Sequence, residues 1–254
     1  MTRRLVASAA AFLFLAGSAS YLSAGTERLR PLHLKERCVN KSDRARIVRF
    51  SASDRARLLG VSLGSGRIGV ALGHESDGTL CNWMSFARIL KQNGYRVLAF
   101  DFRGWGSSPG VGTARRGRLD LDFAAAARSL RKLGAEKIVF AGASIGANAA
   151  LAAATEVTPR ASAVVSLSAV DSTFSSRLDG TATVPKLTVP VLFMAAESDS
   201  GPAEDARKLY SQTLTVDKKL LIVGGGAHGT VMLRGARGAS PREAVLDFVR
   251  VHTG

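Results

Sequence analysis

Residues 139–150 read VFAGASIGANAA, so a single serine stands among residues that have almost no side chain. The β-branched and aromatic run before it is typical of a buried strand, and the alanine-rich run after it favours a helix. Ser144 therefore lies at a direct strand-to-helix turn, which strains the backbone of its central residue. Side chains two positions before and after would collide with the neighbouring strand and helix. Gly142 and Gly146 occupy these positions, so we expect the Ser144 hydroxyl to project at the carboxyl edge of a sheet.

The rest of the chain alternates strands with helices. Two alternating apolar runs joined by a polar turn, 45–52 and 57–64, predict a β-hairpin. Beyond it, apolar runs typical of buried strands alternate with helical periodicities. The further strands are expected at 67–74, 95–102, 137–143, 162–170, 189–197 and 219–225, and the helices at 79–94, 119–134, 145–156, 203–213 and 241–252. This order predicts an α/β fold with an eight-stranded, mostly parallel sheet, an antiparallel N-terminal hairpin and helices on both faces.

The composition excludes several classes of protein. The chain has 254 residues and a net charge of +15, but its basic residues are scattered and aromatics make up only 6%, so we expect a solvated basic surface and no nucleic-acid partner. Four histidines and two cysteines, without HExxH or paired CxxC motifs, predict no metal site. Two G-x-G-x-x-G matches, at 64–69 and 224–229, lack the strand and helix context of a dinucleotide site, so no cofactor is expected.

The N-terminus has the pattern of an export signal. A basic start, MTRR, precedes the apolar run LVASAAAFLFLAG and then the small residues GSAS. We therefore expect a signal peptide at 1–20, cleaved after Ala19 or Ser20, followed by an extension at 21–43 and a single α/β domain at 44–254. The apolar run is shorter than the roughly 20 residues that cross a bilayer. The prediction is a secreted or extracytoplasmic protein with no stable membrane span after cleavage, and the alternative is an uncleaved N-terminal membrane anchor.

Export also affects the expected oxidation state of the two cysteines. In an oxidising compartment, Cys38 and Cys81 are expected to form a disulfide that closes a long loop. The alternative is that Cys81 is a small core residue of the predicted helix 79–94.

A serine nucleophile needs a base and an acid at the same sheet edge. His228 follows the last strand in a Gly-rich loop that lets its ring approach closely, and His74 ends an earlier strand at that edge and competes with it. Asp199 directly follows the strand 189–197 and is the expected acid, with Asp171 as the fallback. The chain order Ser144, Asp199, His228 supports this set.

Four segments in this order resemble the α/β-hydrolase superfamily. GASIG (142–146) resembles its nucleophile elbow, and YRVLAFDFRGWGSS (95–108) resembles its fourth-strand segment. VPVLFMAAESDSGP (189–202) is similar to the acid-bearing strand, and GGGAHG (224–229) to the histidine loop.

The resemblance implies an oxyanion hole built from backbone N–H groups. One is that of Ile145 and the other is that of Ser76 or Glu75, because the chain reads Gly-His-Glu-Ser where many relatives carry His-Gly. A charged Glu75 beside an oxyanion would be unfavourable unless its side chain turns away.

The stretch 171–188 is too short for a lid domain, as in dienelactone-hydrolase-like and small carboxylesterase members of the superfamily. The expected function is that of a secreted serine hydrolase that cleaves a small soluble carboxylic ester, or a related acyl bond, without metal or cofactor. The alternatives are an acyltransferase or peroxidase-like activity on the same triad, and a secreted binding protein without catalysis. The sequence does not determine the acyl or alcohol group of the substrate or the oligomeric state.

Overall fold

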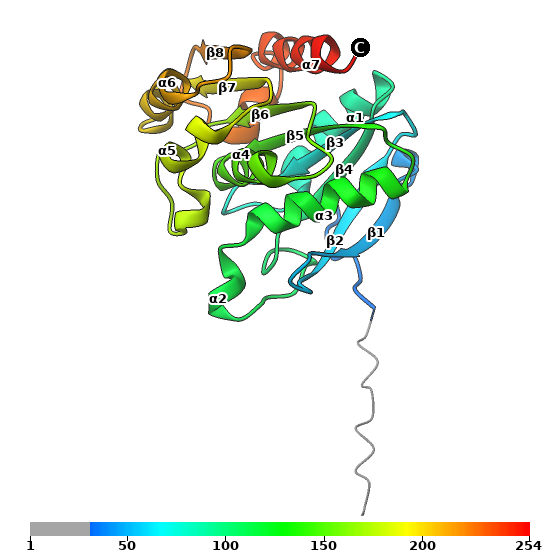
Figure 1. Cartoon of the computed structure of the whole chain (residues 1–254). Coiled ribbons are helices and arrows are strands. Elements are labelled where there is room, and N and C mark those ends of the chain that lie inside the picture. Colours follow the sequence, from blue (N-terminus) through cyan, green and yellow to red (C-terminus); the bar gives the residue numbers. More distant parts are fainter. Residues whose placement is uncertain (1–30) are drawn as a thin grey trace, which may run out of the picture. The chain divides into compact units, whose positions relative to one another are not determined.

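The computed structural model describes residues 31–254 and contains an eight-stranded sheet in the order β1-β2-β4-β3-β5-β6-β7-β8 (Figure 1). β1 pairs with β2, and β2 with β4, in antiparallel fashion, while every other pair is parallel. The strands are β1 (Arg46–Ser51), β2 (Arg57–Leu63), β3 (Ile68–Gly73), β4 (Arg96–Asp101), β5 (Lys137–Ala143), β6 (Ala163–Leu167), β7 (Val191–Ala196) and β8 (Lys218–Val223). The predicted mostly parallel sheet with an antiparallel hairpin is confirmed.

Helices cover both faces of this sheet because neighbouring residues of its central strands point to opposite sides. In β5, Ile138 and Phe140 face a core that includes α3 and α4, whereas Val139 and Ala141 face a core that includes α1 and α7. The helices are α1 (Met84–Gln92), α2 (Thr113–Arg116), α3 (Leu119–Lys132), α4 (Ile145–Glu156), α5 (Gly180–Thr183), α6 (Pro202–Gln212) and α7 (Ala239–Thr253). Only two 3₁₀ turns and the one-turn helix α5 lie between β6 and β7, so a large lid is absent from the described chain.

The segment before β1 is fastened to the domain. Leu32, Leu34 and Val39 pack against the core under α1, and a disulfide joins Cys38 to Cys81. This disulfide is the predicted one. The predicted signal peptide at 1–20, with its cleavage site, lies outside the described residues.

An ion pair reinforces the same attachment. Arg88 of α1 donates to both carboxylate oxygens of Asp43, at 2.7 and 2.9 Å, and to the carbonyl of Cys38 at 2.8 Å. The guanidinium holds the pKa of Asp43 below its ordinary value. Covalent and ionic links therefore hold the residues just before β1 against α1.

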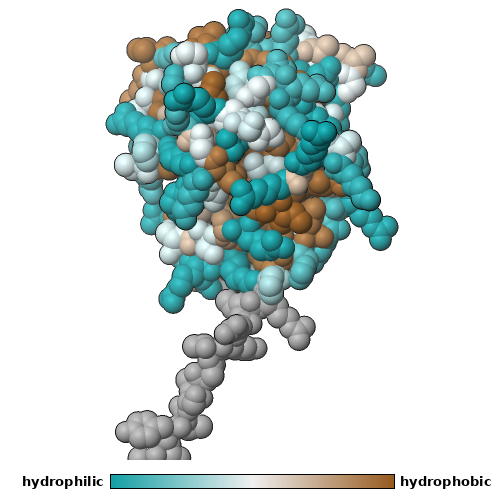
Figure 2. All heavy atoms as spheres, turned by 90° about the vertical axis from the view of Figure 1, so that its right-hand side faces the viewer, coloured by the Kyte–Doolittle hydropathy of each residue, from teal (hydrophilic) through white to brown (hydrophobic). Residues whose placement is uncertain are grey.

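Hydrophilic side chains cover most of the face seen in Figure 2, with a smaller apolar area among them. No helix within residues 31–254 is long and apolar enough to cross a bilayer.

Two buried side chains, one at the end of β4 and one just after it, organise the loops at the carboxyl edge of the sheet. The first is Asp101, whose carboxylate accepts the backbone N–H of Leu80 at 2.7 Å and that of Ser107 at 2.8 Å. Burial, with the Glu36 carboxylate nearby, raises the pKa of Asp101 to about 7. Asp101 thereby ties the loop after β3 to the loop after β4.

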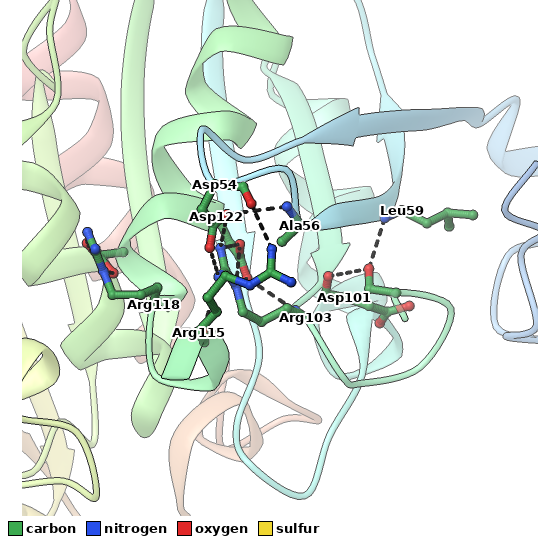
Figure 3. A network of polar contacts seen from close by, with 10 residues as sticks. Asp54, Ala56, Leu59, Asp101, Arg103, Arg115, Arg118 and Asp122 are labelled. Atoms are coloured by element: carbon green, nitrogen blue, oxygen red, sulfur yellow. Dashed lines mark hydrogen bonds and ion pairs between the residues drawn. The ribbon is translucent and has the colours of Figure 1, made fainter. Parts of the chain in front are cut away.

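The second is Arg103, whose side chain is fully buried between two carboxylates (Figure 3). Its guanidinium donates to Asp122 of α3 and to Asp54 of the β1–β2 turn, and it reaches the carbonyl of Arg115 at 2.9 Å. A buried guanidinium is tolerated when paired charges and hydrogen bonds compensate its lost hydration. Arg103 therefore fixes α2 to the body of the domain.

The disulfide gives the first prediction. It closes a loop with a sequence separation of 43, so the double variant Cys38→Ser/Cys81→Ser is expected to lose about 2–4 kcal/mol of unfolding free energy. Urea unfolding checks this, with reductant added to the wild type as the matched control. Equal midpoints for the variant and the oxidised wild type would contradict it.

Candidate active site

Ser144 occupies the turn between β5 and α4 with φ 54° and ψ −124°. This positive φ is rare for a residue with a side chain and marks a strained backbone. Its N–H donates to the carbonyl of Leu167 at 2.8 Å, and its carbonyl accepts from the N–H of Ala147 at 2.8 Å, so strand pairing and helix formation both hold it. The residue is half-buried at the carboxyl edge.

Gly142 and Gly146 flank Ser144, and backbone atoms occupy the space that a side chain at either position would need. A Cβ on Gly142 would lie 2.0 Å from the carbonyl oxygen of Gly146. A Cβ on Gly146 would lie 2.4 Å from the carbonyl oxygen of Gly73 and 2.6 Å from that of His74. The first turn of α4 therefore packs directly on the end of β3, which the sequence predicted only as general crowding.

The structure brings the predicted acid and base together. Nδ1 of His228 lies 2.9 Å from Oδ2 and 3.1 Å from Oδ1 of Asp199. With Nδ1–H donating to the carboxylate, Nε2 carries the free lone pair of the ring. The Asp199 side chain is 10% exposed and the His228 side chain 40%, so the carboxylate is shielded while the imidazole remains accessible.

Within the described part of the chain, no hydrogen bond joins Ser144 to His228. Such bonds are often long in unliganded enzymes and tighten when substrate binds. Ser144, Asp199 and His228 follow β5, β7 and β8, whose carboxyl ends lie at one edge of the sheet.

Ser168, which sequence reasoning missed, links the acid to the histidine loop. Its hydroxyl donates to Oδ2 of Asp199 at 2.8 Å and accepts the N–H of Gly229 at 3.0 Å. Ser168 is fully buried and has φ 48°. The only sequence signal was a serine directly after a strand next to the acid-bearing strand.

The Glu75 carboxylate holds the same histidine loop from the other side. Oε1 accepts the N–H of Thr230 at 2.7 Å and its hydroxyl at 2.6 Å. Gly229 has φ 53°, and a Cβ there would lie 2.7 Å from Oε1 of Glu75, so the loop packs tightly on the carboxylate. The Glu75 side chain is therefore engaged with the loop that follows His228.

The backbone amides expected to form an oxyanion hole are available. No described residue accepts a hydrogen bond from the N–H of Ile145, Glu75 or Ser76. The contact of Gly146 with the end of β3 brings the start of α4, and with it Ile145, close to the loop that carries the other two. The Ser76 carbonyl accepts Nε1–H of Trp105 at 2.6 Å, which fixes this loop from outside.

A family model described as alpha/beta hydrolase fold matches residues 69–186, from β3 past the nucleophile turn. The chain has the α/β-hydrolase fold. No curated protein sequence matches it.

Solved structures share the α/β-hydrolase fold at low sequence identity. An esterase of Pyrococcus furiosus is 19% identical with a TM-score of 0.72, covering 84% of this chain and 93% of the esterase. A dienelactone hydrolase of Anabaena variabilis is 18% identical with a TM-score of 0.66, covering 82% and 97% of the two chains. A monoacylglycerol lipase of Paleococcus ferrophilus is 17% identical with a TM-score of 0.66, covering 77% and 99%.

The competing histidine, His74, has both ring nitrogens bonded to backbone groups. Nδ1–H donates to the carbonyl of Glu75 at 2.6 Å, and Nε2 accepts the N–H of Phe102 at 3.2 Å. Burial lowers the pKa of His74 to about 4. A neutral ring in this setting fastens two loops together and has no free lone pair to serve as a base.

The fallback acid has a partner of its own, and the remaining side chains near it add no further candidate. Asp171, the fallback acid, pairs with Lys208 of α6 at 2.8 Å, which lowers the pKa of the Asp171 carboxyl. Glu197 is exposed just past the end of β7. His252 bonds to Phe248 and Asp217, and among residues 31–254 no group of three or more metal-ligating side chains is arranged to hold an ion.

The loss of stability in acid tests the role of His74. The folded protein holds this ring at a pKa of about 4 against 6.5 in the unfolded chain, so the unfolded chain takes up the proton first as pH falls. Between pH 7.5 and pH 5 the wild type should lose about 2 kcal/mol more unfolding free energy than His74→Gln. The carboxylates near the ring belong to Glu36, Glu75 and Asp77. They are present in both proteins, so their contributions to the difference in unfolding free energy cancel.

Urea unfolding at the two pH values measures the difference, and imidazole NMR of the wild type gives the pKa directly. Parallel losses in the two proteins, or an NMR titration near 6.5, would contradict the buried neutral ring.

Ser168 offers a stability test with a control two residues earlier, at Ser166 in β6. Ser168→Ala leaves the Gly229 N–H without its acceptor and Asp199 short of one donor, so unfolding free energy should fall by about 1–3 kcal/mol. Ser166 is also buried, but its hydroxyl has no hydrogen-bond partner among the described residues, so Ser166→Ala should cost less. Equal losses in the two variants, measured by urea unfolding, would show that the Ser168 bonds do not stabilise the site.

Proposed function

We propose that this α/β-hydrolase is a serine hydrolase that cleaves carboxylic esters through an acyl-enzyme on Ser144. The observation that carries the proposal is the bond from His228 Nδ1 to Asp199 beside a serine held at positive φ. A strained turn that exposes a hydroxyl, with an oriented imidazole at the same edge, is the arrangement that activates a serine. The printed descriptions of the structural relatives, an esterase, a dienelactone hydrolase and a lipase, support ester cleavage as the reaction.

In the acylation step, Ser144 Oγ attacks the ester carbonyl while Nε2 of His228 takes its proton. Asp199 keeps Nδ1 protonated and stabilises the imidazolium. The N–H of Ile145 and that of Glu75 or Ser76 bind the oxyanion, each donor contributing a factor of roughly 10²–10³ in rate. His228 then protonates the leaving alcohol.

In deacylation the same imidazole removes a proton from water, which attacks the acyl-enzyme and releases the acid. This second step returns the proton to Ser144 Oγ. The side chains and amides named above suffice for both steps, so we propose no metal or organic cofactor.

Small, soluble esters are the proposed substrate class. The residues between β6 and β7 form only short turns, so no large domain among the described residues covers the site. A site without a lid needs no lipid surface to open it.

We also propose that the protein works outside the cytoplasm, with a signal peptide at 1–20, an extension at 21–43 and a catalytic domain at 44–254. The Cys38–Cys81 disulfide supports an oxidising compartment, where such bonds persist.

The direct test is the Ser144→Ala variant. It should lower kcat/KM for 4-nitrophenyl esters by roughly 10³-fold or more, because the nucleophile is removed. Ser172→Ala, an exposed serine in the loop after β6, is the matched control and should keep wild-type activity. Near-normal hydrolysis by Ser144→Ala would refute the serine mechanism.

The ester panel also separates the alternatives. Transfer of the acyl group to added alcohols at the expense of the free acid would favour an acyltransferase. Absence of hydrolysis by the wild type across a range of acyl lengths would favour a binding protein that keeps the fold.

A further inference from the structure

Two adjoining hollows lie beside the loop after β4. The first, of about 500 Å³, is lined by Trp105, Val111, Arg116 and Phe174 among others. The second, of about 710 Å³, shares Arg116 and Phe174 and adds Arg115 and Arg177. We call the surface formed by Trp105, Val111, Phe174, Arg115, Arg116 and Arg177 the basic groove.

The arginines of the basic groove lack acidic partners. No carboxylate among the described residues forms an ion pair with Arg115, Arg116 or Arg177. The one acidic side chain in the lining of the two hollows, Asp54, is bound to Arg103. The groove thus carries positive charge that the protein itself does not neutralise.

Part of the groove lining is apolar. Phe174 is 65% exposed, which leaves a large aromatic surface in water, and Trp105 lies beside it in the first hollow. Ligand sites are concave and lined by apolar and aromatic side chains with a few polar groups, and the first hollow combines Trp105, Val111 and Phe174 with Arg116. The groove therefore offers an apolar wall and a cationic wall to one ligand.

Hydrogen bonds within the protein hold the walls of the groove in place before any ligand binds. Arg103 holds α2 through the Arg115 carbonyl (Figure 3), and Ser175 Oγ donates to the carbonyl of Gly117 at 3.3 Å, joining the two segments that form the walls. Asn148 of α4 exchanges two hydrogen bonds with Val170 at the start of the loop that carries Phe174. Little ordering entropy would have to be lost on binding.

The groove also adjoins the catalytic edge. Trp105 donates its Nε1–H to Ser76, one of the two residues proposed for the oxyanion hole, and Phe174 lies on the loop that follows β6, the strand next to β5. We therefore expect a ligand that lies along Trp105 to connect the loop of Ser76 with Arg116, which lines the same hollow.

We propose that the basic groove binds an organic anion that is part of the substrate, so that the enzyme prefers esters carrying a carboxylate on an apolar spacer. The spacer packs on Trp105, Val111 and Phe174, and the carboxylate pairs with Arg116 and Arg177, whose forked donors match its two oxygens. This inference rests on the proposed ester hydrolysis and names the substrate class.

The kinetic test compares mono(4-nitrophenyl) adipate with its neutral methyl ester. The wild type should show the higher kcat/KM for the anionic ester, and the preference should shrink as salt is added. Arg116→Gln and Arg177→Gln should each lower the preference roughly fivefold through KM, the upper range for an exposed ion pair. Both arginines are exposed, so neither substitution disturbs the core.

The matched control is Arg160→Gln. Arg160 is an exposed arginine before β6, at the opposite edge of the sheet, and it should leave the preference unchanged. Equal kcat/KM for the two esters, or the same loss in Arg160→Gln as in the groove variants, would overturn the proposal.

Direct binding separates failure of the groove from failure of the proposed function. Calorimetry with 4-phenylbutyrate and its uncharged analogue 4-phenylbutyramide needs no turnover. The carboxylate should bind the wild type more tightly than the amide and weaken roughly fivefold in Arg116→Gln. If no ester is hydrolysed but this difference holds, the groove stands and the hydrolase proposal fails; if the two compounds bind alike, the groove proposal fails.

Discussion

The close approach of helix α4 to the end of β3 is the constraint on which the rest of the site depends. It is possible because Gly146 has no Cβ where the carbonyls of Gly73 and His74 lie. The approach forces a sharp turn at Ser144 and gives that residue its positive φ. It also brings the free N–H of Ile145 to the loop that carries Glu75 and Ser76. One packing contact thus exposes the hydroxyl and assembles the proposed oxyanion donors.

Around this contact, buried polar side chains hold the loops at the carboxyl edge. His74 and the Asp101 carboxylate both join the loop after β3 to the loop after β4. Ser168 joins Asp199 to the loop that carries His228. Buried polar groups stabilise only when their hydrogen bonds are made, and they then fix one geometry. This explains how a site without a large lid keeps its residues in place, because each loop is tied to its neighbour rather than covered.

The sequence was sufficient for the eight strands and the five longer helices, and for naming three candidate side chains, for identifiable reasons. Strand and helix periods are local, and the residue that follows a parallel strand lies at the carboxyl edge wherever that strand sits in the sheet. Ser144, Asp199 and His228 could therefore be named as candidates without coordinates. The order of β4 and β3 in the sheet, by contrast, is not encoded in the local sequence. The same holds for which neighbouring strand each loop contacts.

For the same reason, the sequence could not foresee which polar groups are used structurally. His74 looked like a second candidate base because the two backbone groups that occupy its ring come from different loops. The charge of Glu75 was expected to be unfavourable beside an oxyanion. The partner that binds its carboxylate, Thr230, lies 155 residues further along the chain and could not be foreseen. Asp54 read as a turn residue, yet its carboxylate pairs with Arg103. These pairings depend on tertiary contacts, which the spacing of apolar residues along the sequence does not reveal.

A crystal structure of the protein after reaction with a 4-nitrophenyl alkylphosphonate tests the central claim most directly. The account predicts phosphorus bound covalently to Ser144 Oγ, with the phosphonyl oxygen within hydrogen-bond distance of the Ile145 N–H and of the N–H of Glu75 or Ser76. Nε2 of His228 should face the leaving-group side of the adduct. An adduct on another residue, or an adduct on Ser144 whose oxygen points away from these amides, would contradict it.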